Sequence, residues 1–184
     1  MGNKNKKLKW SFGTTAIIGA LIGLSFLGTF IIRIPIPATT GYFNLGDVFV
    51  ILAGLWLGPL IGCIVGATGP ALADLIGFPQ FALATFIIKG LMGFMVGLIA
   101  GGLSNTSVTR RIIASSVGGI ILVGGYFVFE AFIYPYLGKY IPLFSVTTIG
   151  AAITEILPNT IQAIIGALGG ISLWKTLSDI HVTN

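Results

Sequence analysis

Several side chains able to form ion pairs or hydrogen bonds interrupt segments that are otherwise apolar. Lys89 lies inside the apolar run 81–102, and Glu155, Glu130 and Asp74 lie in three further apolar runs. An ionisable group inside hydrocarbon costs about 2.5–3.5 kcal/mol on insertion scales, so each one needs a partner or a wet cavity. Their chemistry is that of a polar binding site, and the segments that carry them decide where that site lies.

The composition requires a membrane as the solvent for those segments. Of the 184 residues, 55% are hydrophobic and 8% are charged, and the mean hydropathy is +1.01. A soluble domain carries about 25% charged residues, so this chain has too few charges to cover a water-exposed surface. We therefore expect an all-α integral membrane protein, and the net charge of +5 does not indicate nucleic-acid binding. At about 20 residues per span, the length allows six spans and no separate soluble domain.

The distribution of basic residues decides between five and six helices. The run 47–77 is either one tilted helix or two short helices broken at Gly58-Pro59, because proline removes a helix donor. If the N-terminal lysines are cytoplasmic, Arg110 and Arg111 follow the positive-inside rule only when four spans precede them. We thus expect a single transmembrane domain over residues 1–184, with both termini cytoplasmic and helices at about 12–32, 47–58, 60–77, 81–102, 112–134 and 149–174.

The N-terminal segment fits an uncleaved first helix. Lys4, Lys6, Lys7 and Lys9 precede Trp10, which is typical of an interfacial anchor on the cytoplasmic side. The apolar run that follows approaches the length of a full span and ends at no clear A-x-A site, which argues against a signal peptide.

The charged residues fall at similar depths in this topology. At 1.5 Å per residue, Lys89 lies about 12 Å below the outer end of its helix, and Asp74, Glu130 and Glu155 share the outer half. We expect a pocket that opens outward, with hydrogen-bonding candidates on neighbouring turns: Asn159, Gln162, Thr85 and Gln80. The alternative is that Lys89 pairs with Glu155 or Asp74 only to hold helices together.

Aromatic residues and two connections add to this expectation. Ring faces suit a flat ligand, and the same helices carry Phe81, Phe86, Tyr126, Phe129 and Phe132. The segment 33–44 contains two prolines and predicts a semi-rigid extended loop that covers the site, with Tyr42 helping to close it. The segment 135–148 is either a second lid or an interfacial aromatic belt, and its tyrosines favour the belt.

Small residues form two helical stripes. Ala16 and Ala20 share one face of the first helix, and Gly54, Gly58, Gly62 and Gly66 repeat every four residues. Small-xxx-small faces let helices approach closely, and packing within the chain is the simplest explanation for both stripes.

Missing motifs exclude several functions. The sequence contains no G-x-x-x-x-G-K-[ST] phosphate loop, so active transport would have to draw its energy from another protein. Cys63 is the only cysteine and excludes an intrachain disulfide, while His181, the only histidine, lies in the polar tail. We expect no metal site and no cofactor.

The stretch 44–102 resembles the S component of an energy-coupling factor (ECF) vitamin transporter, above all in D-L-I-G-F-P-Q and T-F-I-I-K-G-L-M-G. The helix count, the Ala16-x-x-x-Ala20 face and the long loop after the first helix extend the resemblance over nearly the whole chain. Within the family the chain is most similar to hydroxymethylpyrimidine- or pyridoxine-type members of the riboflavin-type branch.

The resemblance implies a subunit in a bacterial plasma membrane that captures a B-vitamin from outside. It implies docking through Ala16 and Ala20 on a transmembrane coupling subunit that carries two cytoplasmic ATPases, which use the ATP. Asn44, at the end of the loop 33–44, is also a substrate-binding candidate.

Two other functions compete with this one. Leu45-Gly46-Asp47 together with Asp74 resembles the aspartate pair of intramembrane aspartyl proteases, but a carboxylate at a helix start also complements the helix dipole, and we favour that interpretation of Asp47. A channel or a secondary transporter that works alone is the second alternative to a vitamin-specific S component.

Overall fold

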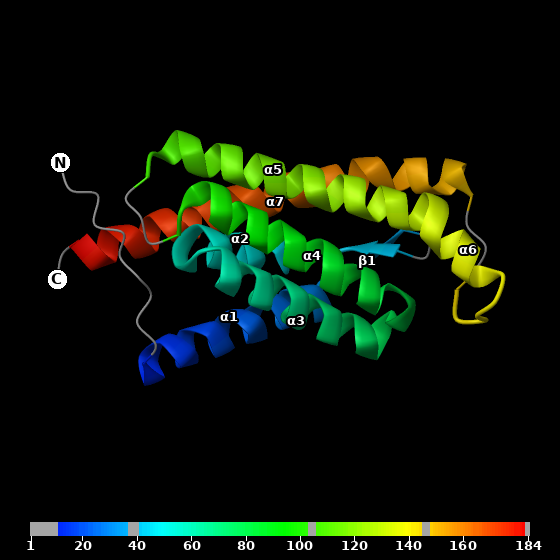
Figure 1. The fold of residues 1–184 in the computed structure, drawn as a ribbon, viewed down its shortest axis with the longest axis horizontal. Helices are drawn as coiled ribbons and strands as arrows, with labels where there is room; N and C mark the ends of the chain where they lie inside the picture. Colours follow the sequence, from blue (N-terminus) through cyan, green and yellow to red (C-terminus); the bar gives the residue numbers. More distant parts are fainter. Residues whose placement is uncertain (1–10, 37–40, 103–105, 145–147, 183–184) are drawn as a thin grey trace.

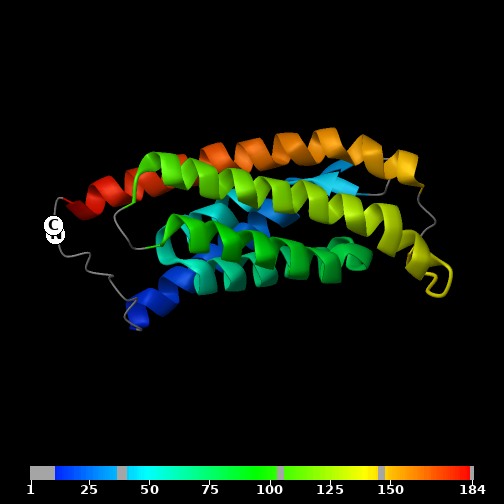
Figure 2. The same ribbon diagram turned by 45° about the horizontal axis from the view of Figure 1, so that its top comes forward.

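A computed structural model describes residues 11–36, 41–102, 106–144 and 148–182, so the expected lysine and tryptophan anchor of residues 4–10 lies outside the described part. The described chain is a bundle of long helices with one small hairpin (Figures 1 and 2). Its elements, in chain order, are α1 Phe12–Phe30, β1 Ile34–Ile36, β2 Gly41–Phe43, α2 Asp47–Leu57, α3 Pro59–Gly77, α4 Pro79–Ala100, α5 Val108–Val128, the π-helix η1 Phe129–Ile133, α6 Tyr134–Gly138 and α7 Ile149–Val182.

Five helical stretches are long and apolar enough to cross a membrane by themselves. These are α1, α3, α4, the continuous helix Val108–Gly138 and the stretch Ile149–Ser178 of α7. The remaining principal helix, α2, has 11 residues and is too short to be counted with these five. It lies inside the bundle, where Val50, Ile51 and Leu55 are fully buried. The all-α membrane fold with six principal helices is therefore confirmed, with α2 as its apolar centre.

The chain breaks between α2 and α3 at the predicted Gly58-Pro59. Gly58 has φ of 95°, a conformation that glycine adopts without strain, and Pro59 occupies the first turn of α3. This turn lies at the same end of the bundle as the start of α1, the α4–α5 connection and the end of α7 (Figure 1). The hairpin, the α3–α4 turn and α6 lie at the opposite end, which we call the hairpin end.

Arg111 is buried at the Gly58 end and ties three helices together. It is only 3% exposed, and its guanidinium donates to the Leu55 carbonyl at the end of α2 and lies 3.8 Å from the centre of the Trp174 ring of α7. A cation at a helix C-terminus complements the helix dipole. Arg111 thus has a structural role in addition to its use in the sequence analysis, where its charge indicated the topology.

The glycine stripe packs α3 directly against α4. A Cβ atom at Gly62 would lie 2.3 Å from the carbonyl oxygen of Gly93, and one at Gly66 would lie 2.1 Å from that of Lys89. The two backbones therefore touch, as small-xxx-small faces allow. Packing within the chain is confirmed for this stripe, and it brings the backbone of Lys89 into the centre of the bundle.

The segment after α1 is more ordered than the expected extended loop. β1 and β2 form an antiparallel hairpin in which Ile34 faces Phe43 and Ile36 faces Gly41, and residues 37–40 lie outside the described part. In the other connection, Tyr136 and Tyr140 are exposed and contact each other edge to face. Neither tyrosine contributes to the pocket described below, which agrees with an interfacial belt.

Candidate functional site

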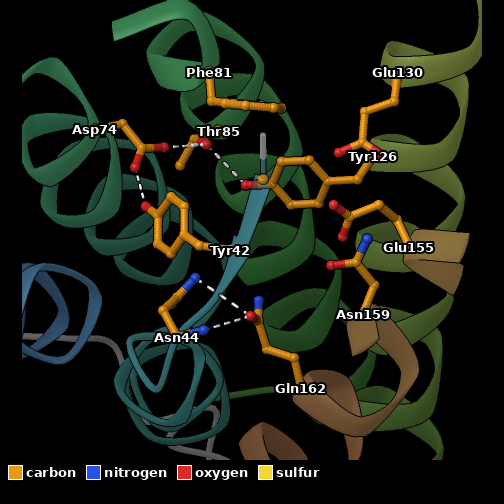
Figure 3. A pocket seen from close by; sticks show the side chains of 11 residues that line it. Tyr42, Asn44, Asp74, Phe81, Thr85, Tyr126, Glu130, Glu155, Asn159 and Gln162 are labelled. Atoms are coloured by element: carbon orange, nitrogen blue, oxygen red, sulfur yellow. Dashed lines mark hydrogen bonds between the residues drawn. The ribbon is translucent and has the colours of Figure 1, made fainter. Parts of the chain in front are cut away.

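A narrow polar pocket lies at the hairpin end, between the hairpin and helices α3, α4, α5 and α7 (Figure 3). Its cavity volume is about 20 Å³, well below the range for small-molecule sites, so the lining side chains nearly fill it. It is lined by Gly41, Tyr42, Asn44, Asp74, Phe81, Thr85, Tyr126, Glu130, Glu155, Asn159 and Gln162. Eight of these are among the ten side chains that we selected from the sequence as substrate-binding candidates.

One side of the pocket is a chain of hydrogen bonds from the hairpin to α5. The Tyr42 hydroxyl donates to one oxygen of Asp74, and the Thr85 hydroxyl donates to the other at 2.5 Å. Thr85 also shares a hydrogen bond of 2.8 Å with the hydroxyl of Tyr126. Asp74 is thus held between β2 and α4 (Figure 3).

Arg33 secures Tyr42 from outside the pocket. Its guanidinium lies 4.6 to 5.3 Å from the ring centres of Phe30, Tyr42 and Phe78, and donates to the Ala73 carbonyl at 2.7 Å. The Tyr42 ring also stacks on Phe78 at 4.4 Å. Burial, followed by the charge of Asp74, raises the pKa of Tyr42, so its hydroxyl stays protonated and acts as a donor.

The floor of the pocket is formed by two amide side chains. The side-chain oxygen of Gln162 accepts from the backbone nitrogen of Asn44 at 2.7 Å and from its side-chain nitrogen at 3.3 Å. The Gln162 nitrogen donates to Asp47 at 2.6 Å. The Asn44 oxygen accepts from Lys89, from Gly46 and from the Thr29 hydroxyl.

Lys89 lies behind this floor and pairs with a different carboxylate from the two that we expected. Its ammonium is 2.8 Å from Asp47 and 3.1 Å from the Asn44 oxygen, and its side chain is fully buried. The expected pairing with Glu155 or Asp74 is therefore wrong, because α2 places Asp47 directly against α4. Lys89 does not line the pocket, so a direct contact between its side chain and a ligand is not supported. We call Asn44, Asp47, Lys89 and Gln162 the floor network.

The opposite side of the pocket carries two carboxyl groups and an amide. Glu130 comes from the π-helix η1, and Glu155 and Asn159 lie one turn apart on α7. All three are buried, and Figure 3 shows their polar groups directed into the same space. We call these three residues the acidic wall. Single-turn π-helices inside α-helices are frequent at functional sites, and no feature of the sequence predicted this one.

Two of the five candidate aromatic residues reach the pocket. Phe81 and Tyr126 line it, while Phe129 packs behind Phe81 with ring centres 5.9 Å apart. Phe86 and Phe132 are about half exposed on the outer surface of the bundle, so the expectation that they contribute ring faces to the site is wrong.

Gln80 is half-buried in the first turn of α4 and does not line the pocket either. Proline at position 79 starts that helix, and the side chains that reach the pocket from it are Phe81 and Thr85, one turn apart. Of the lining residues, sequence reasoning missed only Gly41, which has no side chain to attract notice. It also assigned Asp47 a capping role rather than a place in the floor network.

Comparison with known proteins identifies the relatives of this chain. The model for the family described as "ECF-type riboflavin transporter, S component" matches residues 9–179. A protein of Pyrococcus woesei, described as an uncharacterized protein in the gap 3′ region, is 39% identical over 142 residues, which cover 77% of this chain and 86% of that protein.

Two solved structures share the fold. The S component of a bacterial ECF transporter superimposes with a TM-score of 0.70 at 20% identity, covering 92% of this chain and 98% of that one. FolT bound with folic acid superimposes with a TM-score of 0.57 at 15% identity, covering 90% of this chain and 95% of that one. These structural similarities show that the fold is shared, and the match to the family model shows that this chain is related to that family. The chain belongs to the S-component family of ECF transporters, whose members are substrate-binding subunits of vitamin transporters and not enzymes.

Proposed function

We propose that this S component captures a single-ring B-vitamin or vitamin precursor in the pocket at the hairpin end. The best candidates are hydroxymethylpyrimidine and a pyridoxine-type vitamer. The observation that carries the proposal is the pocket itself, where aromatic walls from Phe81 and Tyr126 stand beside hydrogen-bonding groups on every other side. A flat heterocycle needs that combination of ring contacts and a few directed polar contacts.

The size of the pocket favours one ring over three. The cavity volume is about 20 Å³, so any vitamin must displace lining side chains or the hairpin, and a flavin would require a larger displacement than a substituted pyrimidine or pyridine. Riboflavin remains the second candidate because the matching family model carries that vitamin in its description.

We propose that the hairpin end faces the outside and the Gly58 end faces the cytoplasm. Arg110, Arg111 and Lys175 lie toward the Gly58 end, in agreement with the positive-inside rule. Labelling of an introduced cysteine at Ser107, in a Cys63→Ala background, tests this orientation. Labelling from outside intact cells would reverse it.

We propose that uptake requires a transmembrane coupling subunit and two cytoplasmic ATPases, with ATP consumed by those partners. Ala16 and Ala20 are exposed on α1, and a Cβ atom at Gly19 or Gly23 would meet nothing within 4 Å. This face therefore stays open within the chain, which supports its use in docking. If the chain were instead a secondary transporter or a channel, it would support uptake without partner subunits.

The decisive experiment identifies the small molecule that purifies with the full chain. Mass spectrometry of the ligand released by denaturation should detect a pyrimidine or pyridine vitamer, and riboflavin would show directly by its absorbance. Uptake of the identified molecule is then measured in cells with and without the coupling subunit and ATPases. Uptake by the chain alone would contradict the proposed assembly.

A further inference from the structure

The side of the pocket that runs from the hairpin to α5 contains hydrogen bonds whose directions can be deduced. It consists of Tyr42, Asp74, Thr85 and Tyr126, which we call the Asp74 network (Figure 3). The Tyr42 hydroxyl donates to one oxygen of the Asp74 carboxylate, and the Thr85 hydroxyl donates to the other at 2.5 Å. A hydroxyl has a single proton to donate. Tyr42 and Thr85 have therefore both used theirs on Asp74.

The direction of the next hydrogen bond follows from the first two. The hydroxyl oxygens of Thr85 and Tyr126 are 2.8 Å apart. Because the Thr85 proton is directed at Asp74, the Tyr126 hydroxyl is the donor in this contact and Thr85 the acceptor. Tyr126 makes no second hydrogen bond to any residue that the structure describes. Its hydroxyl can therefore accept a hydrogen bond from a ligand but has no proton left to give.

The Asp74 network thus offers acceptors to the pocket and no spare proton. Two acceptor oxygens that meet in a buried site leave both without a donor, and an unsatisfied buried polar group is costly. A ligand with an N–H group at this side completes the network, whereas a ligand with an acceptor there is rejected. The directions of the hydrogen bonds therefore carry specificity that the list of lining residues alone does not.

Asn159 on the opposite side gives an independent indication of a polar ligand. Its side chain is 6% exposed and points into the pocket, yet its amide makes no hydrogen bond to any described residue. Buried amides are almost always hydrogen-bonded, so a polar group of a ligand is expected beside it. An amide both donates and accepts, so Asn159 satisfies either kind of group and does not choose between them.

The hydrogen bonds also indicate which side of the pocket stays in place when a ligand enters. The cavity is about 20 Å³, so a ligand must displace lining side chains. Tyr126 is held by Thr85, and the Tyr42 ring stacks on Phe78 at 4.4 Å, whereas no hydrogen bond within the described part holds the amide of Asn159. We expect the Asp74 network to keep its hydrogen bonds while the opposite side gives way.

We propose that Tyr126 determines the specificity of the pocket by accepting a hydrogen bond from an amino group on the ligand ring, with Thr85 and Asp74 as positioning residues that fix the direction of its hydroxyl. This inference rests on the proposed function and narrows its substrate class to aminopyrimidines. An amino group conjugated with a ring donates and does not accept, so it matches a side without spare protons. A pyridoxine hydroxyl both donates and accepts, and it matches that side less well.

Three probes that differ at one ring position test this inference on the full purified chain. They are hydroxymethylpyrimidine, which carries a ring amino group, and its analogues with a methyl or a methoxy group in place of the amino group. Calorimetry measures each Kd, and pyridoxine and riboflavin are titrated in parallel. The amino compound should bind at least about tenfold more tightly than the methyl analogue, and about a hundredfold more tightly than the methoxy analogue, whose oxygen meets an acceptor.

Substitutions in the Asp74 network should change these preferences and not only the affinity. Tyr126→Phe removes the acceptor, so the preference for the amino over the methyl compound should fall to about threefold or less. Thr85→Val leaves the Tyr126 hydroxyl free to donate, so the preference over the methoxy analogue should fall about tenfold or more, and Thr85→Ser should restore it. Tyr136→Phe is the control, since that tyrosine is exposed and lies outside the pocket, and it should change neither preference.

The outcomes separate a failure of this inference from a failure of the proposed function. Preferences that are the same in Tyr126→Phe and Thr85→Val as in the unchanged chain would overturn the role of Tyr126. Binding of pyridoxine or riboflavin but not of the aminopyrimidine would also overturn it, and vitamin capture would stand. Binding of none of the five probes to the folded chain would overturn the proposed ligands as well. If Thr85→Val does not fold, Tyr126→Phe decides, because it leaves both hydrogen bonds to Asp74 in place.

Discussion

The floor network and the acidic wall both place carboxyl and amide side chains at the same end of the bundle, but they face different surroundings. In the floor network, an ammonium, a carboxylate and two amides satisfy each other across β2, α2, α4 and α7. In the acidic wall, two carboxyl groups and an amide line the pocket instead. A polar residue inside a membrane protein can thus be structural or ligand-binding, and its neighbours decide which.

The comparison also corrects a simple rule. An intramembrane ionisable residue is a functional candidate by default, and Lys89 is the most conspicuous one in this sequence. The fold nevertheless assigns it to anchoring the hairpin base, because Asn44 accepts its hydrogen bond. The less conspicuous glutamates of α7 and η1 face the ligand space instead.

The largest effect that we expect comes from breaking the ion pair of the floor network. Lys89→Met leaves the Asp47 carboxylate buried and without its cation, which should destabilise the fold by about 3–5 kcal/mol. The double variant Lys89→Met, Asp47→Asn should recover most of that loss. Thermal unfolding in detergent measures both.

A second double variant sharpens this test. Lys89→Met, Glu155→Gln should remain as unstable as Lys89→Met alone, because Glu155 is not the partner. If the Glu155 change restores stability and the Asp47 change does not, the ion pair has been assigned to the wrong carboxylate.

A somewhat smaller loss of stability is expected from disrupting the α3–α4 contact that positions Lys89. Gly66→Ala places a methyl group 2.1 Å from the Lys89 carbonyl, so α3 and α4 must separate, at a cost of about 1–3 kcal/mol. Gly124→Ala on α5 is the matched control, since its Cβ would meet nothing within 4 Å and alanine favours a helix by up to about 1 kcal/mol. Equal unfolding temperatures for the two variants would show that the α3–α4 contact can relax freely.

The third prediction compares the two amides of α7 directly. Gln162→Leu leaves the Asn44 backbone nitrogen and one Asp47 oxygen without a partner, so stability should fall by about 1–3 kcal/mol. Asn159→Leu should change stability by less than about 1 kcal/mol and instead weaken ligand binding about tenfold or more. Unfolding curves and binding isotherms on both variants are the measurements, and a stability loss confined to Asn159→Leu would reverse the roles of floor and wall.

The sequence was sufficient to predict the architecture because the signals involved are strong and local. Each of these signals can be recognised from neighbouring residues alone: apolar runs of span length, the Gly58-Pro59 break, and the position of Arg110 and Arg111. Glu155, Asn159 and Gln162 share one helical face at spacings of four and three residues, so their convergence was also predictable.

Pairing between helices could not be predicted in the same way. The partner of Lys89 depends on how deeply the short α2 is inserted, which places Asp47 beside α4. The direction of Glu130 depends on the π-helix, where one extra residue in a turn changes which side chains face inward. Both are consequences of tertiary packing that no local pattern records.

The smallest effect on the pocket is expected from changes on the exposed face of α1. Ala16→Trp with Ala20→Trp adds bulk where neither side chain is buried, far from both the floor network and the acidic wall, so ligand affinity should stay within about a factor of two of the unchanged chain. Uptake should nevertheless be lost, because two indole rings hold a docking helix away from a close small-residue contact.

Leu168→Trp is the matched control for that double variant, since residue 168 is 64% exposed on α7 and offers no small-residue face. It should leave both binding and uptake unchanged, which separates loss of docking from a general effect of added tryptophan in the membrane. If the α1 variant still purifies with the coupling subunit and supports normal uptake, that face is not the docking surface. The exposed small residues of α1 would then contact only lipid, and the coupling subunit would have to bind another side of the bundle.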